Sequence, residues 1–453
     1  MIKIKFLGAA GTVTGSKFLL TLDHYKVLID CGLFQGIKYL RSLNRDPLPV
    51  NISEIDSVLL THAHLDHSGY LPLLVKSGYK NEIYMTGPTQ QLAAIVLKDS
   101  AKIQEEDADK ANREGYSKHS PALPLYTEKE VEACFKQFRV VEPESWVSLD
   151  EKIQFRYRKN GHILGSCYLE IAYDGKIFVF SGDVGRKETL VLEKPLTPER
   201  ADVLVVESTY GNRVHKKTSP EDELCDIIHE AIENKGNILI SSFAIGRAQE
   251  LMVVLQRLKK QKRIPDIPIY LDSPMSSEAT KVLFQNPHWH KLSYEECLAI
   301  AEDVFFVKTV EDSTAVMNIP GSKIVIAASG MLAGGRILNY LKEYIEDARN
   351  TILLVGYQAE GTRGKALKDG AEEIKIHGQY YKVKAGVREL NTLSAHADKE
   401  ELIDWVKNIK TPPAYVFLVH GENDALHALH STIKKQLGWN AIIPSLHDEV
   451  NLF

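Results

Sequence analysis

The segment THAHLDHSG constrains this chain more than any other part of its sequence. It places three imidazoles and one carboxylate, from His62, His64, His67 and Asp66, within six residues. It follows the short apolar run SVLL, which we expect to be a strand. Side chains two apart in an extended chain point the same way, so His62 and His64 can bind one ion while Asp66 and His67 turn toward a second. Imidazole and carboxylate suit zinc, manganese or iron, so the segment predicts a metal-binding loop rather than a solvated loop with incidental histidines.

Other side chains of the metal-ligand type occur in a similar setting elsewhere. Each stands beside a strand-like run and within two residues of glycine or serine, and the set consists of Asp30, His162, Asp183, Glu207, His396 and His420. Any one of them alone is better interpreted as a capping or loop residue. Together they form a repeated pattern, which indicates that several strands deliver ligands to one edge of a sheet.

The hydrophobic pattern divides the chain into a strand-rich part and an alternating part. The first part is expected to contain strands over 1–7, 16–21, 26–29, 57–60, 153–183 and 201–208, and a helix over 89–118. Thr127 and Glu130 are spaced as a capping box, which predicts that another helix begins there. The second part is expected to contain helices over 220–234, 246–258 and 336–345, and strands over 237–242, 267–271, 323–328 and 351–356. Helices that alternate with strands are typical of a parallel sheet.

These motifs resemble those of the metallo-β-lactamase superfamily and, within it, of the β-CASP nucleases. The loop from His62 to His67 resembles the superfamily's own motif, and ESTYGNR with Glu207, SAHAD with His396 and VHGE with His420 resemble the three β-CASP motifs. SFAIGRAQE, DSPM, SGMLAGGR and GYQAEGTRGKAL resemble segments of the inserted β-CASP domain. The resemblance covers essentially the whole chain. Within that branch the chain resembles the short bacterial stand-alone RNA nucleases related to the mRNA 3′-end cleavage endonuclease and RNase J.

The resemblance implies an α/β fold, namely a metallo-β-lactamase αββα sandwich that carries an inserted α/β β-CASP domain. The order of the ligands agrees, because they end near Glu207 and resume at His396. If all of them meet at one site, the intervening chain must leave the catalytic domain and return. We therefore expect a first part of the metallo-β-lactamase domain over 1–211, the inserted domain over 212–385, and a second part over 386–453.

The resemblance also implies a role for each ligand-type side chain. The first metal would be held by His62, His64 and His162, the second by Asp66, His67 and His420, and both by a bridging Asp183. Two Zn²⁺ ions per chain are expected, with Mn²⁺ as the alternative. Asp30 would steady the ligand loop from outside the metal shell. The catalytic set would be His396 as proton donor, Glu207 as the carboxylate that orients it, and Asp66.

The expected activity is metal-dependent hydrolysis of RNA. Two metals about 3.5–4 Å apart can form hydroxide from a bound water and stabilise charge on the phosphoryl oxygens. A proton from His396 to the leaving 3′-oxygen would leave 5′-phosphate and 3′-hydroxyl ends. The motifs are compatible with both endonucleolytic and 5′-exonucleolytic action.

Glycine-rich or proline-containing turns of the inserted part supply the candidate RNA contacts. These are Ser242, Arg247, Ser273, Ser329 and Arg363. Backbone amides at a helix start attract phosphate, and an arginine can add a bidentate contact. The alternative interpretation is that the two arginines pair with nearby acids such as Glu250 and Glu360.

Three other functions use the same sequence features. A thioester or lactam hydrolase on this metal core would have no reason to carry the insertion or the SAHAD histidine. A DNA nuclease of the same branch is disfavoured because its third motif usually has valine where this chain has His420. A scaffold that binds RNA or protein without cutting would be expected to lose metal ligands, and this chain keeps them all.

Composition sets the remaining expectations for this chain of 453 residues with net charge −5. A negative chain needs a local basic surface to bind single-stranded RNA, the expected partner. The five cysteines are dispersed, which argues for reduced thiols and a cytoplasmic location. No stretch has the length and apolarity of a membrane span. A homodimer is compatible with these features.

Overall fold

The computed structural model describes residues 1–115, 119–216, 218–356, 358–359, 361–390 and 392–453. These residues form two compact units. The first contains Met1–Thr189, Glu193–Val214 and His396–Phe453, and the second contains Leu190–Leu192 and His215–Ala395. The division of the chain into three parts after residues 211 and 385, expected from the sequence, stays a proposal.

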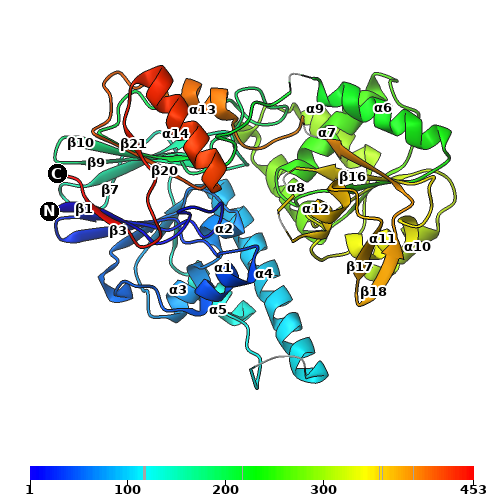
Figure 1. Ribbon diagram of the computed structural model, residues 1–453, viewed down its shortest axis with the longest axis horizontal. Coiled ribbons are helices and arrows are strands. Elements are labelled where there is room, and N and C mark those ends of the chain that lie inside the picture. The colour runs from blue at the N-terminus through cyan, green and yellow to red at the C-terminus, as the bar shows by residue number, and fades with distance from the viewer. Residues whose placement is uncertain (116–118, 217, 357, 360, 391) are drawn as a thin grey trace. The chain divides into compact units, whose positions relative to one another are not determined.

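Two seven-stranded sheets form the centre of the first unit (Figure 1). The first sheet, in the order β22-β1-β2-β3-β4-β5-β6, consists of β1 (Ile2–Phe6), β2 (Phe18–Leu22), β3 (Tyr25–Ile29), β4 (Ser57–Leu59), β5 (Ile83–Met85), β6 (Phe138–Val140) and β22 (Glu449–Asn451). The second, in the order β21-β20-β11-β10-β9-β8-β7, consists of β7 (Val147–Ser148), β8 (Gln154–Lys159), β9 (Cys167–Tyr173), β10 (Lys176–Phe180), β11 (Val203–Glu207), β20 (Tyr415–Val419) and β21 (Ala441–Ile442).

The two sheets of this unit pack face to face through apolar rings. The ring centroids of Phe6 and Phe417 are 5.0 Å apart, and those of Phe18 and Phe180 are 6.3 Å apart. All four rings are buried. Burial of such rings between two sheets supplies much of the stabilisation of a sandwich.

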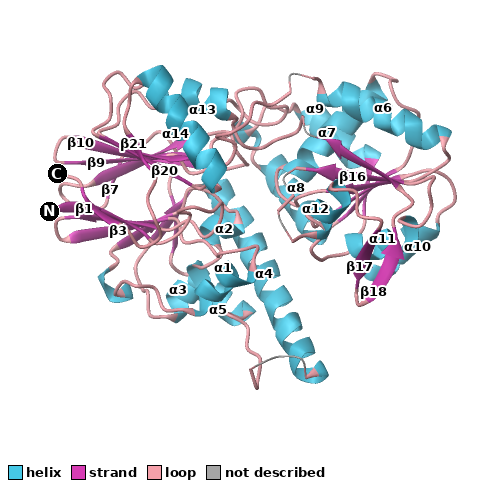
Figure 2. Ribbon diagram, viewed as in Figure 1, coloured by secondary structure: helices cyan, strands magenta, loops and turns pink. Residues whose placement is uncertain are grey.

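Helices cover both outer faces of this sandwich (Figure 2). On the side of the first sheet lie α1 (Lys38–Ser42), α2 (Leu65–Ser68), α3 (Leu71–Lys76), α4 (Gly87–Glu114) and α5 (Glu128–Phe135), with the short 3₁₀ helices η1 (Leu43–Arg45) and η2 (Ile52–Glu54). On the second sheet lie α13 (Lys399–Val406) and α14 (Asn423–Leu437), where Trp405 and Leu429 pack with Leu204 and Leu418. The predicted αββα arrangement is confirmed.

The local predictions for this unit agree with its elements. The strands expected near the N-terminus are confirmed, with ends shifted by one or two residues. The capping box of Thr127 and Glu130 is present at the start of α5. The helix expected over 89–118 is α4, which ends at Glu114, and positions 116–118 lie outside the described residues.

The second unit is built around a six-stranded sheet in the order β14-β13-β15-β12-β16-β19. Its strands are β12 (Ile238–Ser241), β13 (Ile269–Asp272), β14 (Val304–Phe306), β15 (Ile324–Ala327), β16 (Thr351–Val355) and β19 (Gly386–Leu390). All of its strand pairs are parallel, which confirms the prediction from the alternating pattern. A separate antiparallel pair is formed by β17 (Glu373–Ile376) and β18 (Gln379–Lys382).

Helices connect the strands of this parallel sheet. They are α6 (Pro220–Glu233), α7 (Arg247–Lys260), α8 (Pro274–Gln285), α9 (Tyr294–Asp303), α10 (Val310–Asn318), α11 (Ile337–Tyr344) and α12 (Arg363–Lys368), with the 3₁₀ helix η3 (Pro287–Trp289). One core of the unit joins Leu239, Val325 and Ile352 of the sheet with Leu341 of α11 and Leu367 of α12.

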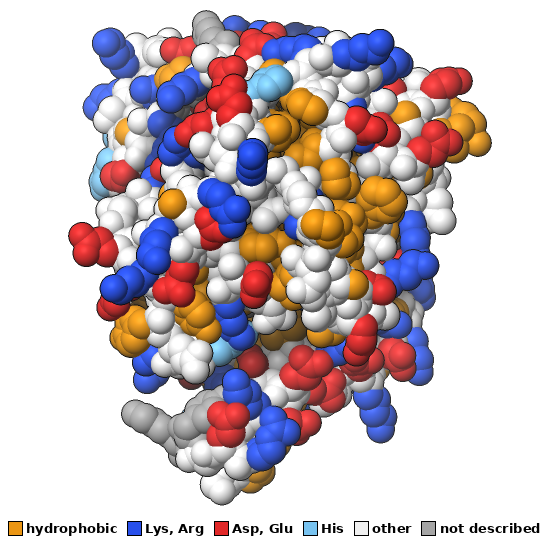
Figure 3. All heavy atoms as spheres, turned by 90° about the vertical axis from the view of Figure 1, so that its right-hand side faces the viewer, with side chains coloured by type: hydrophobic (Ala, Val, Ile, Leu, Met, Phe, Trp, Pro, Cys, Tyr) orange, Lys and Arg blue, Asp and Glu red, His pale blue; other side chains and the backbone are white. Residues whose placement is uncertain are grey.

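The surface of the protein carries charges of both signs (Figure 3), and its thiols are buried. On the face seen in Figure 3, Lys and Arg side chains intermingle with Asp and Glu side chains. All five cysteines are buried free thiols. Among the described residues, the helices lack the combination of length and apolarity that crossing a membrane requires.

Candidate metal centre

The ligand-type side chains of the first unit stand at one end of its sandwich. β3 and β4 run parallel in one sheet, and β10, β11 and β20 run parallel in the other, so the carboxyl ends within each set meet at one edge. Asp30 follows β3, the His62 loop follows β4, Asp183 follows β10, and His420 follows β20. Asp30 and His420 have positive φ angles of 57° and 49°, which turn the chain sharply after each strand.

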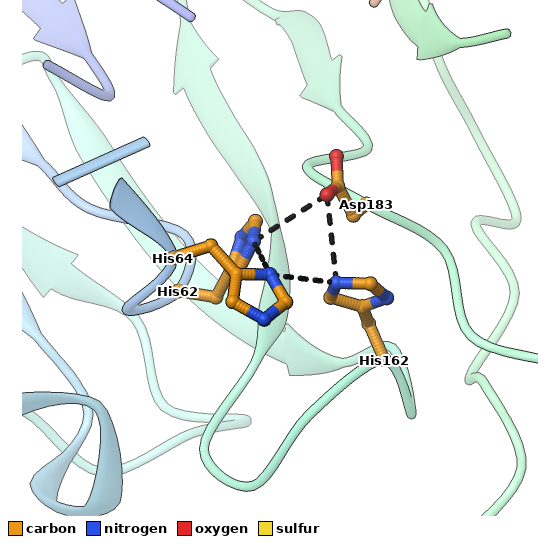
Figure 4. Close-up of side chains that lie close together, drawn as sticks. All are labelled: His62, His64, His162 and Asp183. Atoms are coloured by element: carbon orange, nitrogen blue, oxygen red, sulfur yellow. Dashed lines mark hydrogen bonds and ion pairs between the residues drawn. The ribbon is translucent and has the colours of Figure 1, made fainter. Parts of the chain in front are cut away.

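A first cluster contains His62, His64, His162 and Asp183, whose ligand atoms lie within 4.8 Å of one another (Figure 4). Nδ1 of His64 is 3.1 Å from Nε2 of His62 and 3.1 Å from Nε2 of His162. Oδ2 of Asp183 is 3.4 Å from Nε2 of His62 and 3.5 Å from Nε2 of His162. Burial lowers the pKa of His64 to about 3 and also lowers the pKa values of the other two histidines. The rings are therefore neutral, which is the form that binds a metal.

A second cluster contains Asp66, His67 and His420, again within 4.8 Å. Nε2 of His420 lies 3.2 Å from Oδ2 of Asp66 and 3.2 Å from Nε2 of His67. The second carboxylate oxygen of Asp183, Oδ1, lies 3.2 Å from Nε2 of His67. Asp183 therefore presents one oxygen to each cluster.

The residues present fit metal ions. Oδ1 of Asp183 is buried, and although Nε2 of His67 is 3.2 Å away, it makes no well-aligned hydrogen bond among the described residues. A buried carboxylate oxygen without a partner is costly unless something else satisfies it. Imidazole nitrogens and carboxylate oxygens that converge in this way are a donor set for zinc, manganese or iron.

Asp30 supports the loop that carries His62 and His67 from behind. Its Oδ2 lies 2.7 Å from Nδ1 of His67 and accepts a hydrogen bond of 2.9 Å from the hydroxyl of Thr61, while Oδ1 accepts one of 2.8 Å from the Thr61 amide. Thr61 Oγ1 is also 3.1 Å from Nδ1 of His62. Contacts of this kind fix the orientation of ligating imidazoles and raise their basicity.

His396 and Glu207 form a pair beside the first cluster. Nδ1 of His396 lies 3.2 Å and 3.3 Å from the two carboxylate oxygens of Glu207. Burial lowers the pKa of His396, but the Glu207 carboxylate outweighs burial and raises that pKa to about 9. The His396 ring centroid is 4.5 Å from that of His162. The arrangement can hold a proton on His396 next to the metal-binding residues.

Sequence reasoning missed two supporting residues. Oγ1 of Thr209 lies 3.1 Å from Nδ1 of His420, and its signal was its place in the ESTYGNR motif, in the turn that follows Glu207. Lys17 is buried and donates a 2.6 Å hydrogen bond to the carbonyl of Gly32, under the ring of Phe34. Its pKa is lowered to about 8, chiefly by burial. A lysine at the start of a strand is ordinarily exposed, so the sequence carried no signal for it.

We expect Thr209→Val to weaken metal binding at the second cluster. Valine keeps the shape of threonine but removes the hydroxyl that orients His420. Loss of such a contact typically lowers metal affinity about 10–100-fold, and competition against a chelator measures it. Thr209→Ser keeps the hydroxyl and should retain the parent affinity. An unchanged affinity in the valine variant would show that Thr209 does not orient His420.

The candidate RNA contacts lie in the second unit, near the carboxyl ends of its parallel strands. Ser242 follows β12, Ser273 caps α8 after β13, and Ser329 follows β15. The guanidinium of Arg247 is buried against Glu250, as the alternative interpretation expects. Arg363 donates to the carbonyls of Lys375 at 2.6 Å, Leu332 at 3.1 Å and Ala333 at 3.2 Å, and Glu360 lies outside the described residues. Phosphate contact by either arginine would have to compete with these partners.

Three family models match consecutive parts of the chain. Residues 19–195 match the metallo-beta-lactamase superfamily domain, residues 248–367 the Beta-Casp domain, and residues 380–444 the Zn-dependent metallo-hydrolase RNA specificity domain. A solved structure of a protein of unknown function from Enterococcus faecalis V583 has the same fold, with a TM-score of 0.54 and 12% identity over 99% of each chain.

Curated relatives match over nearly the full length of the chain. Ribonuclease TTHA0252 of Thermus thermophilus is 36% identical over 94% of this chain and 95% of its own. The RNase J-like protein of Methanocaldococcus jannaschii is 30% identical over 98% of both chains. Transcription termination factor FttA of the same organism is 30% identical over 100% of this chain and 72% of its own. The chain belongs to the β-CASP branch of the metallo-β-lactamase superfamily.

Proposed function

We propose that this protein is a metal-dependent ribonuclease that hydrolyses RNA phosphodiester bonds and leaves 5′-phosphate and 3′-hydroxyl ends. The observation that carries the proposal is the position of His396, whose ring is 4.5 Å from that of His162 while its Nδ1 contacts Glu207. A proton donor next to a metal-binding cluster suits a reaction that must protonate a leaving oxygen. Two relatives named as a ribonuclease and as RNase J-like support RNA as the substrate.

The two clusters would bind the metal ions, and His396 with Glu207 would supply the proton. Metal ions bound at the two clusters would supply a water of lowered pKa and positive charge near the phosphoryl oxygens. Glu207 accepts from Nδ1 of His396, so the transferable proton sits on Nε2. From Nε2 the proton can pass to the leaving 3′-oxygen, a contribution of about 10²–10⁴-fold to the rate.

We propose two metal ions per chain, zinc in the first instance and manganese as the alternative. His62, His64 and His162 would hold one, Asp66, His67 and His420 the other, and Asp183 both. The contacts of Asp183 to histidines of both clusters support this division. Single-stranded RNA as partner, a homodimeric state and a cytoplasmic location belong to the same proposal.

Mapping of cleavage products tests this function. RNA labelled at either end is incubated with the protein beside a DNA oligonucleotide of matched sequence, and product ends are identified by phosphatase and ligase treatment. We expect cleavage of RNA in preference to DNA, with 5′-phosphate products. Equal rates on RNA and DNA would contradict the RNA assignment, and 2′,3′-cyclic ends would contradict attack by a metal-activated water. The same mapping separates endonucleolytic from 5′-exonucleolytic action.

Phosphate contacts in the second unit also belong to the proposal. With net charge −5 and basic side chains intermingled with acidic ones on the face in Figure 3, a polyanion needs local contacts rather than a general positive field. We propose Ser242, Arg247, Ser273, Ser329 and Arg363 for this role. Among these five residues, Arg247 has the strongest alternative role, because its guanidinium is buried against Glu250.

We expect Arg247→Ala to lower stability, because it leaves the Glu250 carboxylate without its guanidinium partner. The Arg247 and Glu250 side chains are only 6% and 14% exposed, and loss of one partner of such a contact costs about 1–3 kcal/mol. Urea denaturation measures it. Arg349→Ala breaks an exposed pair with Asp347 and should leave the midpoint almost unchanged. Parent-like stability of Arg247→Ala, together with a shallower salt dependence of RNA binding, would instead place Arg247 on phosphate.

A further inference from the structure

The sheet of the second unit has a topological switch at β12. In the order β14-β13-β15-β12-β16-β19, the chain leaves β12 toward β13, whereas it leaves β15 toward β16 and β16 toward β19, in the opposite direction. Right-handed crossovers that run in opposite directions place their helices on opposite faces. The loops after β12 and after its two neighbours therefore diverge, and ligands bind at the carboxyl ends of strands at such points.

Phe243 occupies this switch point. It is the second residue after β12 and is 38% exposed, although it is a large apolar side chain. Its ring lies against two glycines that follow the neighbouring strands, Gly330 after β15 and Gly356 after β16. A Cβ at Gly330 would lie 2.9 Å from Cδ2 of Phe243, and one at Gly356 would lie 3.6 Å from its Cε2. At these two positions the loops therefore present a glycine backbone to the ring.

Gln358 ties these two loops together. Its buried side-chain amide donates to the carbonyl of Gly330 at 3.1 Å and to that of Gly356 at 3.3 Å. The two glycines that lie against the Phe243 ring are therefore fixed relative to each other by Gln358. A ring that is fixed before its ligand arrives loses little conformational entropy on binding.

The surroundings of the ring select the kind of ligand. Gly330 and Gly356 lie beside the ring, and the next two residues of its own loop, Ala244 and Ile245, are half-buried and buried. Among the described residues of this loop, 242–246, Phe243 is thus the one exposed large apolar side chain. A stable protein interface needs about 800 Å² from each partner, which a single ring does not offer. A flat ring with polar edges can stack on the phenyl face while its edges reach backbone amides and carbonyls, and a nucleobase has that shape.

We propose that Phe243 is a stacking platform for one nucleobase of the single-stranded RNA substrate, a role that rests on the proposed function. Stacking on an aromatic ring tolerates every base, because each has a π-face. The contact is made equally in the ground state and the transition state, so its loss raises KM and leaves kcat nearly unchanged.

An abasic scan of the RNA tests the platform with the intact protein. A short RNA is prepared with one abasic nucleotide at each position in turn, and KM and kcat are measured for the parent and for Phe243→Ala. We expect Phe243→Ala to raise KM about five-fold to a hundred-fold on intact RNA. One abasic position should raise KM for the parent by a similar factor but have no further effect in Phe243→Ala. Phe243→Trp should retain the parent KM.

Binding is read separately, from quenching of 2-aminopurine placed at that same position. Tyr294→Ala removes a more exposed aromatic ring, 73% exposed, from the same unit and should change neither KM nor quenching. If the parent cleaves RNA but no abasic position loses its effect on KM in Phe243→Ala, the platform is overturned and the proposed function still holds. Phe243-dependent quenching without cleavage supports the platform and overturns the proposed function. An equal rise in KM at every abasic position in both proteins would overturn the platform, because Phe243 would then only stabilise the fold.

Discussion

Asp183→Ala should lose metal and RNA cleavage together. Its two carboxylate oxygens face different clusters, Oδ2 at 3.4 Å from Nε2 of His62 and Oδ1 at 3.2 Å from Nε2 of His67. Alanine removes the one carboxylate that both clusters share, so we expect metal content to fall from about two equivalents to below one. The rate should fall by at least about 10³-fold, because several kcal/mol of charge stabilisation depend on the metals. Elemental analysis and a cleavage assay on the same preparation measure both quantities.

Glu170→Ala is the matched control for this variant. Glu170 is also a buried carboxylate in the second sheet of the sandwich, but it pairs with Arg156 away from the clusters. We expect it to lose stability and to keep its metal. Full metal content in Asp183→Ala would remove Asp183 from the bridging position.

His396→Ala should reduce turnover strongly while metal content stays at the parent level. His396 contacts Glu207 through Nδ1 and lies beside His162, and it groups with Asp183 and Glu207 rather than with the histidines of the first or the second cluster. Loss of a general acid costs about 10²–10⁴-fold in kcat. RNA binding should be nearly unchanged, because the proton transfer takes place only in the transition state.

His420→Ala provides the contrast for His396→Ala. The two ring centroids are 6.3 Å apart, yet His420 joins Asp66 and His67 in the second cluster. It should therefore lose metal and turnover together. Loss of a metal in His396→Ala would make His396 a ligand, and parent-like kcat in that variant would leave the reaction without its proposed acid.

The local parts of the fold and site were predictable because their signals are local. Four ligand side chains stand within six residues of one another after an apolar strand, and the alternation of helices and strands after residue 220 was sufficient to predict a parallel sheet. The αββα arrangement followed from the family resemblance, whose motifs occur at the ends of strands.

The remaining features depend on contacts between distant residues, which spacing does not report. Lys17 is buried because Gly32 and Phe34, fifteen and seventeen residues away, surround it. The glycine-rich turn at Arg247 predicted a phosphate contact, but the helix that follows places Glu250 three residues on, within reach of the guanidinium. The β17–β18 pair carried only a short alternation, EIKI and QYYK, which sequence reasoning passed over.

Stepwise restoration of metal to metal-free protein tests whether RNA hydrolysis depends on metal bound at this centre. The protein is stripped with a chelator, its residual metal is quantified, and Zn²⁺ or Mn²⁺ is added back in fractions of an equivalent while cleavage of a labelled RNA is followed. We expect the stripped protein to cut no RNA, and cleavage to return and level off near two equivalents. Cleavage at the parent rate by protein free of metal would contradict metal-dependent hydrolysis by this centre.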